Sequence, residues 1–410
     1  MRIKFSLAIL ALTSLFPAFA QETSTVVEKQ ILTWSGFVRT DAIFDTRQVV
    51  EAREGYLLLY PKKVVLDKNG EDINAHGSYN QYAMTARLAA KVTGPDVLNA
   101  KTMAYIEGDF TGASNSELNS FRLRHAYLKL KWEHSGFLAG QYWHPLNVPE
   151  MLPNVLALNT GAPFHPYNRQ PQFRFDYKSG KLNTMLAIST QRDYTNTGPA
   201  GASTVYLRNS IIPNLDAQVH YVSEKLFAGA GIDYKKLTPR LVTDSNFKTN
   251  SGIGCISYTA FARIKMKPVE IKMQVLYGQG LNDQCIMGGY GVSSTEVLTN
   301  EQQYSPLNYF SGWMTIQTTG KTWQYSLFAG YSKGFGAKDA ITGPVYARDA
   351  DIDYLYRVSP NITYINGKLV IAAECEYTAA AYGKNDAYYK VIDSSPIANT
   401  RIMVSVSYSF

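Results

Sequence analysis

Residues that could carry out catalysis are few and widely spaced in this sequence. Gly330, Ser332 and Gly334 match the G-x-S-x-G string of serine hydrolases, whose mechanism needs a strand, a sharp turn and a helix that together form an oxyanion hole. A polar stretch without helical periodicity follows here, so we interpret the string as the end of a strand. The six histidines show neither HExxH spacing nor close pairing. We therefore expect no enzyme, no metal site and no cofactor.

The cysteines and the charge distribution exclude further classes of protein. Cys255, Cys285 and Cys375 are an odd set without C-x-x-C spacing, which argues against a disulfide framework or a zinc site. Cys255 and Cys285 could pair if the top of one strand meets the next loop, and three unpaired cysteines are the alternative. The formal net charge is +7, but Lys and Arg occur one at a time without a basic run, so we expect no nucleic-acid partner.

The first twenty residues have the features of an export signal. Arg2 and Lys4 precede an apolar run at 5–16, and Ala18 and Ala20 form an A-x-A cleavage site. We expect residues 1–20 to be removed and residues 21–33 to form a short periplasmic segment. No later run approaches the roughly 18 apolar residues of a transmembrane helix, so any membrane role must come from strands.

The C-terminal stretch 400–410 has the pattern of a strand with one apolar face. Apolar residues at every second position from Ile402 to Phe410 alternate with mostly polar ones. Tyr408 and Phe410 lie on the apolar face. This pattern is typical of the closing strand of an outer-membrane barrel, where apolar side chains contact lipid and aromatic ones lie at the interface. An edge strand of a soluble sheet is the alternative.

Similar segments recur from 34 to 410, joined alternately by tight turns and long loops. Short turns on one rim and long loops on the other are the connections of an outer-membrane barrel. We therefore predict an all-β fold, a transmembrane antiparallel β-barrel of sixteen strands with short periplasmic turns and long extracellular loops. A further strand-like stretch at 205–212 would make the number odd, so we assign it to the fourth loop. The predicted strands are 34–47, 81–92, 100–110, 121–133, 137–146, 171–178, 181–193, 214–223, 226–240, 253–266, 269–279, 305–318, 322–335, 350–364, 368–382 and 399–410.

Alternation sorts the side chains into lipid-facing and lumen-facing rows. On strand 81–92 we expect Gln81 and Thr85 to point inward and Tyr82 and Met84 to point to lipid. A charge facing lipid costs up to about 2–4 kcal/mol at the membrane centre, so ionised residues should face the lumen. Strand 121–133 breaks the phase, which a β-bulge or a covering subunit would explain. The pore-lining candidates are Arg39, Asp41, Asp45, Arg87, Lys91, Glu107, Asp109, Arg169, Arg174, Arg263, Lys265, Asp353, Arg357, Glu374 and Glu376.

The size of the barrel and its inward charges indicate a channel. Sixteen strands enclose an aqueous lumen that side chains alone cannot fill. Acidic and basic residues on different walls would create a transverse field, and the basic excess favours anions weakly. The loop at 147–170 is unusually apolar, so we expect it to fold into the lumen as a constriction lined by Tyr167 and Arg169, with a contact between subunits as the alternative. The predicted function is passive diffusion of small hydrophilic solutes; the alternative is an adhesin or structural barrel with a closed lumen.

Several stretches resemble the DcaP-like outer-membrane porins: 121–133 (FRLRHAYLKLKWE), 138–143 (LAGQYW), 234–244 (YKKLTPRLVTD) and 351–360 (DIDYLYRVSP). The resemblance implies a homotrimer of sixteen-stranded barrels in a Gram-negative outer membrane, each with its own pore. In founding members it also implies arginines that favour small anions such as dicarboxylates. Those members carry a periplasmic coiled coil before the barrel, whereas only 21–33 precedes the first strand here. We therefore expect the barrel walls to mediate trimerisation.

Overall fold

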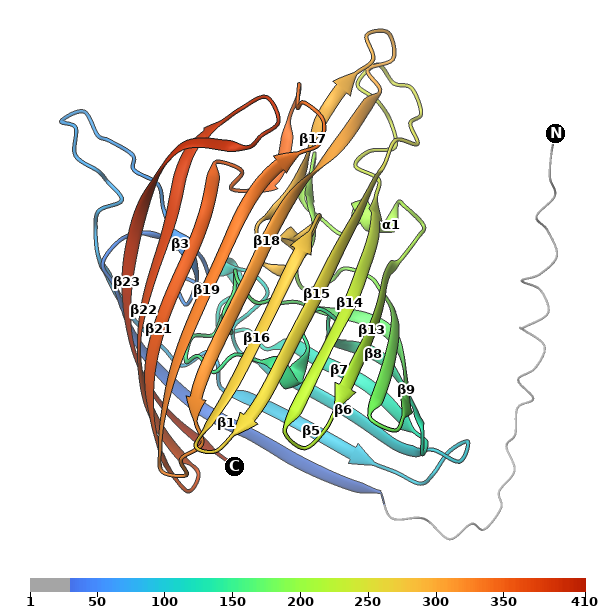
Figure 1. Ribbon diagram of the computed structural model, residues 1–410, viewed down its shortest axis with the longest axis vertical. Helices are drawn as coiled ribbons and strands as arrows, with labels where there is room; N and C mark the ends of the chain where they lie inside the picture. The colour runs from blue at the N-terminus through green and yellow to red at the C-terminus, as the bar shows by residue number, and fades with distance from the viewer. Residues whose placement is uncertain (1–29) are drawn as a thin grey trace, which may run out of the picture.

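The protein forms a closed antiparallel β-barrel (Figure 1). This computed structural model describes residues 30–410, so the predicted export signal lies outside the described residues. The wall closes because β1 (Ile31–Asp45) pairs with β5 (Arg87–Thr93) on one side and with β23 (Val391–Ser409) on the other. Closure pairs the backbone of each wall strand on both sides, which a sheet that crosses lipid requires.

Sixteen strands make up the wall, as predicted. The hydrogen-bonded sheet also contains β17 and β20, which pair with each other near the ends of the long loops, and β4 and β5 are two halves of one wall strand. The remaining wall strands are β4 (Ser78–Tyr82), β6 (Lys101–Asp109), β7 (Arg122–Lys131), β8 (Ser135–Trp143), β9 (Arg169–Ser179), β10 (Leu182–Ser189), β13 (Asn214–Val222), β14 (Leu226–Leu237), β15 (Ile253–Met266), β16 (Val269–Gly278), β18 (Gln302–Thr318), β19 (Trp323–Ala337), β21 (Ile352–Asn366) and β22 (Leu369–Asn385).

Short turns join the strands at one end of the barrel and long loops at the other, in the predicted alternation, and the C-terminus lies at the end with the short turns (Figure 1). The stretch at 205–212 belongs to the fourth long loop, as expected, and contains α1 (Val205–Arg208). Within residues 30–410, the helices are all too short or too polar to cross a membrane. The other short elements lie in the long loops: β2 (Val49–Ala52), β3 (Leu57–Pro61), η1 (Asn115–Glu117), η2 (Pro149–Met151), β11 (Thr197–Gly198), β12 (Gly201–Ala202), η3 (Leu281–Gln284), β17 (Gly288–Thr295) and β20 (Val345–Arg348).

Wall side chains alternate between an exposed apolar row and an inward row. On β19, Trp323, Tyr325 and Leu327 are exposed, whereas Phe328 and Ser332 are buried. The exposed rows of the other strands are apolar as well, so they form the surface that contacts lipid hydrocarbon. Ser332 thus belongs to a regular strand, as we interpreted the G-x-S-x-G string.

A β-bulge explains the broken phase of β7. His125 lies opposite Glu107 and Leu123 lies opposite Gly108, so Arg124 is an extra residue on this strand. Arg124 and His125 are consequently both buried on the inward side. The bulge was one of the two explanations that the sequence suggested.

The first half of the β4–β5 strand faces the opposite way from the prediction. Residues 83–86 interrupt the strand, and Tyr82 lies opposite the inward residue Asp41. Tyr82 and Met84 are therefore buried inside the barrel, while Gln81 is exposed. The prediction was wrong here because an interruption that shifts a strand by one residue exchanges its two faces.

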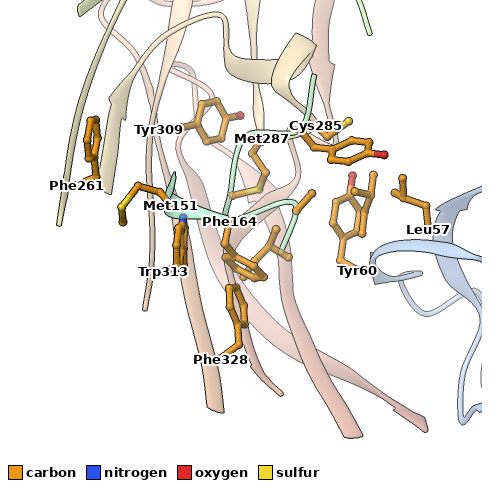
Figure 2. Packing of buried hydrophobic residues seen from close by; sticks show 14 of the residues in the cluster. Leu57, Tyr60, Met151, Phe164, Phe261, Cys285, Met287, Tyr309, Trp313 and Phe328 are labelled. Atoms are coloured by element: carbon orange, nitrogen blue, oxygen red, sulfur yellow. The ribbon is translucent and has the colours of Figure 1, made fainter. Parts of the chain in front are cut away.

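Two loop segments fold into the barrel and fill part of its lumen. The first is the hairpin of β2 and β3, and the second is the L3 segment, residues 144–168, between β8 and β9. Figure 2 shows how their apolar side chains meet those of the wall. Members of this cluster include Leu57 and Tyr60 from the hairpin, Met151 and Phe164 from L3, and Phe261, Tyr309, Trp313 and Phe328 from the wall.

Candidate functional site in the lumen

The L3 segment crosses the lumen and is held by side chains from strands on several sides. Arg357 on β21 donates to the carbonyl of Ala162 at 2.7 Å, and Lys272 on β16 donates to the carbonyl of Leu152 at 2.9 Å. The same kind of bond joins Arg39 to Leu156, Arg263 to Glu150, Gln274 to Leu146, Ser326 to Asn154 and Ser311 to Phe164. Because these donors come from inward rows around the barrel, L3 lies inside it and not at its outer surface.

Apolar contacts fix one side of L3 against the wall. Phe164 packs beside Phe328 with ring centroids 6.2 Å apart, and Trp313 stacks on Phe328 at the same separation (Figure 2). Phe164 is fully buried. Burial of an aromatic side chain contributes about 2–3 kcal/mol, so this contact and the polar anchors both hold the segment in place.

Glu374 on β22 anchors the middle of L3. Its carboxylate accepts hydrogen bonds from the backbone N–H groups of Leu156 at 2.7 Å and Ala157 at 3.2 Å, and from the side chain of Asn361 at 3.3 Å. Bonds from amides to a carboxylate are stronger than those between neutral groups. This buried acid therefore positions the loop instead of facing open water.

Buried polar and charged side chains also anchor the β2–β3 hairpin. Tyr56 donates to the carboxylate of Asp41. Arg401 forms an ion pair with Asp45 at 2.7 Å and donates to the carbonyl of Gly55 at 2.6 Å. Asp41 and Asp45, both predicted to line the pore, are thus covered by the hairpin.

Arginines and acids alternate along β6, β7 and the start of β9, together with Asp193 from the fourth loop. Arg124 binds Glu107 at 2.7 Å and Asp109 at 3.0 Å. Arg122 binds Asp109 at 2.8 Å, and Arg169 binds Asp193 at 2.6 Å. The partners satisfy each other's charge, as buried ions require.

Aromatic rings complete this wall. The guanidinium of Arg169 lies 5.0 Å from the ring centroid of Trp143 and 5.4 Å from that of Tyr167, and Arg124 lies 5.9 Å from Trp143. Such cation–π contacts contribute about 0.5–2 kcal/mol each. Arg169 and Tyr167 are each 1% exposed. Both are packed against neighbouring side chains, whereas we expected them to line the open constriction.

Two loop residues in the lumen have shifted pKa values. Burial raises the pKa of Asp193, but Arg169 and Arg122 lower it by more, so the pKa lies below its ordinary value. Burial lowers the pKa of His165 to about 3, and Lys272 contributes in the same direction. At neutral pH Asp193 is therefore ionised and His165 is uncharged.

A second group of inward charges stays partly open to solvent, and it is mainly basic. The side chains of Arg39, Arg87 and Arg174 are 20%, 24% and 16% exposed. Lys91 and Lys265 are exposed, and Arg263 is half-buried. The acids of this group are Asp176, which pairs with Arg174 at 3.1 Å, Glu270 and Glu150.

Most predicted pore-lining residues lie on inward rows, but they divide into two classes. The candidates that remain partly open are Arg39, Arg87, Lys91, Arg174, Arg263 and Lys265. The candidates buried under loops or within the arginine-rich wall are Asp41, Asp45, Glu107, Asp109, Arg169, Arg357, Glu374 and Glu376. Asp353 belongs to neither class.

Asp353 is out of phase with the rest of its strand. The register of β21 shifts between Ile352 and Tyr354, which leaves Asp353 as the extra residue. It binds Lys333 at 2.6 Å, a member of the outward row of β19, and accepts a hydrogen bond from Ser394. We find no bond from Asp353 to L3 or to the hairpin among the described residues.

Sequence reasoning did not select several residues that shape the lumen. Arg122 and Arg124 were hidden by the bulge, since they shared the phase of the lipid-facing Leu128. Arg401 was treated only as a polar position of the last strand. The apolar run at 57–60 is the one signal that could have revealed the inserted hairpin, because such a run is unusual in an exposed loop. Cys255 and Cys285 are both buried and unpaired.

The fold matches solved outer-membrane channels. No family model and no curated protein matches the sequence. The crystal structure of the outer membrane channel DcaP of Acinetobacter baumannii superposes with a TM-score of 0.68 and 17% identity, covering 93% of this chain and 97% of that one. An anion-selective porin from Comamonas acidovorans gives a TM-score of 0.56 and 9% identity over 93% and 100% of the two chains.

A third structure, the trimer form of OmpT, an outer membrane protein of Vibrio cholerae, gives a TM-score of 0.55 and 10% identity over 93% and 99% of the two chains. The closed wall and its apolar outer surface agree with a place in the outer membrane of a Gram-negative bacterium. The resemblance of the sequence to the DcaP-like porins is thus confirmed at the level of the fold.

Proposed function

We propose that this protein is an outer-membrane channel for the passive diffusion of small hydrophilic solutes, that it favours anions such as carboxylates, and that it works as a homotrimer. The solved structures with the same fold include a channel, an anion-selective porin and a trimer. Their similarity supports the barrel fold of a channel, and the charges of this chain support the preference for anions.

One observation carries the proposal: loops cover the inward acids more completely than the inward bases. Glu374 binds L3 and Asp41 binds Tyr56 of the hairpin, while Asp45 binds Arg401 beneath the hairpin. Arg39 and Arg87 remain partly exposed. A lumen whose solvated charges are mainly basic attracts anions, and this attraction weakens as salt screens it.

A closed barrel that acts as an adhesin or a structural protein is the second candidate. The observation in its favour is the apolar cluster of hairpin and L3 side chains that occupies part of the lumen. That candidate predicts folded protein without conductance, whereas the channel predicts steady ion currents.

The preference is tested by the reversal potential of the channel in a salt gradient across a planar bilayer. We expect the wild-type protein to be anion-selective. Replacing Arg39, Arg87 and Arg174 together by alanine should shift the reversal potential toward cations, because the field in the lumen becomes less positive. As a control, Arg208→Ala removes an exposed arginine of the fourth loop and should change the reversal potential little.

An unchanged reversal potential in the triple variant would show that these arginines do not set the selectivity. Folding of each variant is checked by the heat-dependent mobility of the barrel on gels, so that loss of current is not mistaken for loss of selectivity.

A further inference from the structure

Three side chains that can bind a metal ion converge between L3 and the wall. His144 is the first residue of L3, and Asp216 on β13 lies directly opposite Asp233 on β14. Their possible ligand atoms all lie within 4.8 Å of one another. His144 Nε2 lies 3.9 Å from Asp216 Oδ2 and 3.7 Å from Asp233 Oδ2.

These side chains are buried without enough hydrogen-bond partners. His144, Asp216 and Asp233 are 1%, 4% and 0% exposed. The Nε2 atom of His144 and the Oδ1 atoms of both aspartates have no hydrogen-bond partner among the described residues. Buried polar atoms are normally hydrogen-bonded, whereas the unpaired Nε2 atom of His144 faces the Oδ2 atoms of both aspartates, which points to a bound group between them.

The charges around the site call for a cation. Lys235 binds Asp283 at 2.8 Å and lies farther from Asp233, at 3.8 Å. The carboxylate of Asp283 therefore neutralises the lysine. Asp216 and Asp233 lie directly opposite each other, and a divalent cation at their Oδ2 atoms would balance this buried pair of acids in place of a shared proton.

Asn214 offers a fourth ligand. Its side-chain nitrogen lies 3.0 Å from Asp216 Oδ2 and also contacts Asp233 Oδ2, while its Oδ1 atom has no partner. Rotation of the amide by half a turn would place this oxygen in the site and the nitrogen outside it. One imidazole and three oxygen ligands suit first-row divalent metals such as Zn²⁺.

We propose that His144, Asn214, Asp216 and Asp233 bind a divalent transition-metal ion that fastens the start of L3 to the β13–β14 wall. Zinc ligands lie about 2.0–2.2 Å from the ion in a tetrahedral arrangement, which places ligand atoms about 3.3–3.6 Å apart, so His144 Nε2 at 3.7 and 3.9 Å from the two carboxylates needs to move by only a few tenths of an ångström. Binding through Nε2 moves the ring proton to Nδ1. The long contact of 3.3 Å from the Leu146 N–H to Nδ1 is the one that binding breaks.

The site joins residues far apart in sequence, which is why spacing alone did not reveal it. It acts on the first residues of L3, where Gln274 donates to the carbonyl of Leu146 and Gln218 to that of Pro145, whereas Glu374 holds Leu156 and Ala157. Loss of the ion should therefore loosen the entry of L3 while the rest of the segment stays in place.

The test is metal loading of the full-length mature chain without an affinity tag. The protein is refolded in detergent with ZnCl₂, separated from free metal and analysed by mass spectrometry for zinc. We expect about one Zn²⁺ per wild-type chain, as for a closed four-ligand site, and a higher unfolding temperature than after chelation. The D216N/D233N variant, which keeps the shape of both side chains, should retain little zinc and show no stabilisation.

His134→Gln is the matched control, because His134 lies in an exposed turn beside Glu133 and its loss should not change loading. If the D216N/D233N variant fails to fold, zinc anomalous diffraction from wild-type crystals decides the question. A peak between His144 Nε2 and the two carboxylates supports the site. Equal loading of wild type and variant, or no peak at that position, overturns it; two aspartates that share a proton would then explain their proximity.

Discussion

At the scale of single residues, the same type of side chain has two different uses in this barrel. Arg357 and Arg401 are each 1% exposed and donate to loop carbonyls, whereas Arg39 and Arg87 keep part of their surface in the lumen. A buried guanidinium can satisfy several acceptors at once because it has five donors in a fixed plane. The buried arginines therefore shape the lumen and the partly open ones contribute to its field, while Arg39 does both because it also donates to the carbonyl of Leu156.

Glu374→Ala should loosen L3. It removes the acceptor of two backbone N–H groups, and each unpaired buried donor costs about 1–3 kcal/mol. We expect noisier single-channel currents with frequent changes of conductance, recorded in a planar bilayer. Glu117→Ala, which removes an exposed carboxylate of an outer loop, serves as the control. Equally quiet currents from Glu374→Ala would mean that this anchor does not hold the segment.

His165→Phe should reduce the sensitivity of the barrel to acid. The pKa of His165 lies near 3 in the folded state and near 6.5 in the unfolded state. The unfolded state therefore binds the proton more readily, and stability falls as the pH drops below about 6.5. Between pH 7 and pH 4 this amounts to about 3 kcal/mol, which the phenylalanine variant should not lose.

The measurement is the free energy of unfolding at both pH values. His165 stacks edge-on against Trp313 at 5.3 Å and neither ring nitrogen has a hydrogen-bond partner among the described residues, so phenylalanine fits its surroundings. His134→Phe, at an exposed turn, is the control and should behave as wild type. The same pH dependence in His165→Phe and wild type would contradict the account.

At the scale of the elements, most of the strands could be predicted from the alternation of apolar and polar residues and from the tight turns. The tight joins, such as the one at Gly367 with φ of 60°, separate neighbouring strands at almost the predicted places. The errors arose where one extra residue shifts the phase, at 83–86 and beside Ile352. A period-two pattern contains no signal for such a shift unless charges fall on the wrong face, as they did at Arg122 on β7.

The two faces of β23 should respond differently to a new charge. Val404 is exposed on the lipid side, and Ser407 lies on the inward row. Val404→Lys should lower the free energy of unfolding in lipid vesicles by about 2–4 kcal/mol, while Ser407→Lys should have a much smaller effect. A similar loss in both variants would contradict the orientation of this strand.

At the scale of the whole molecule, the wall was predictable and the contents of the lumen were not. The sequence predicted the inward side of most wall strands but not at Tyr82, Met84 or Asp353. It could not predict which inward residues the loops would cover, because those contacts join positions far apart in the chain, such as Arg357 with Leu59 and Asn159 with Leu58. The transverse field that we expected from an acidic wall is weakened, since Glu374 and Glu376 are buried beneath these contacts.

The central claim is that the lumen still conducts around the two inserted segments. Single-channel recording of the refolded wild-type protein in a planar bilayer tests it most directly. We expect large, steady openings in steps of three, one for each barrel of a trimer. The selectivity of the current should shift toward cations only when the partly open arginines are removed. Silence from protein shown to be folded and inserted would contradict the channel and favour a closed barrel.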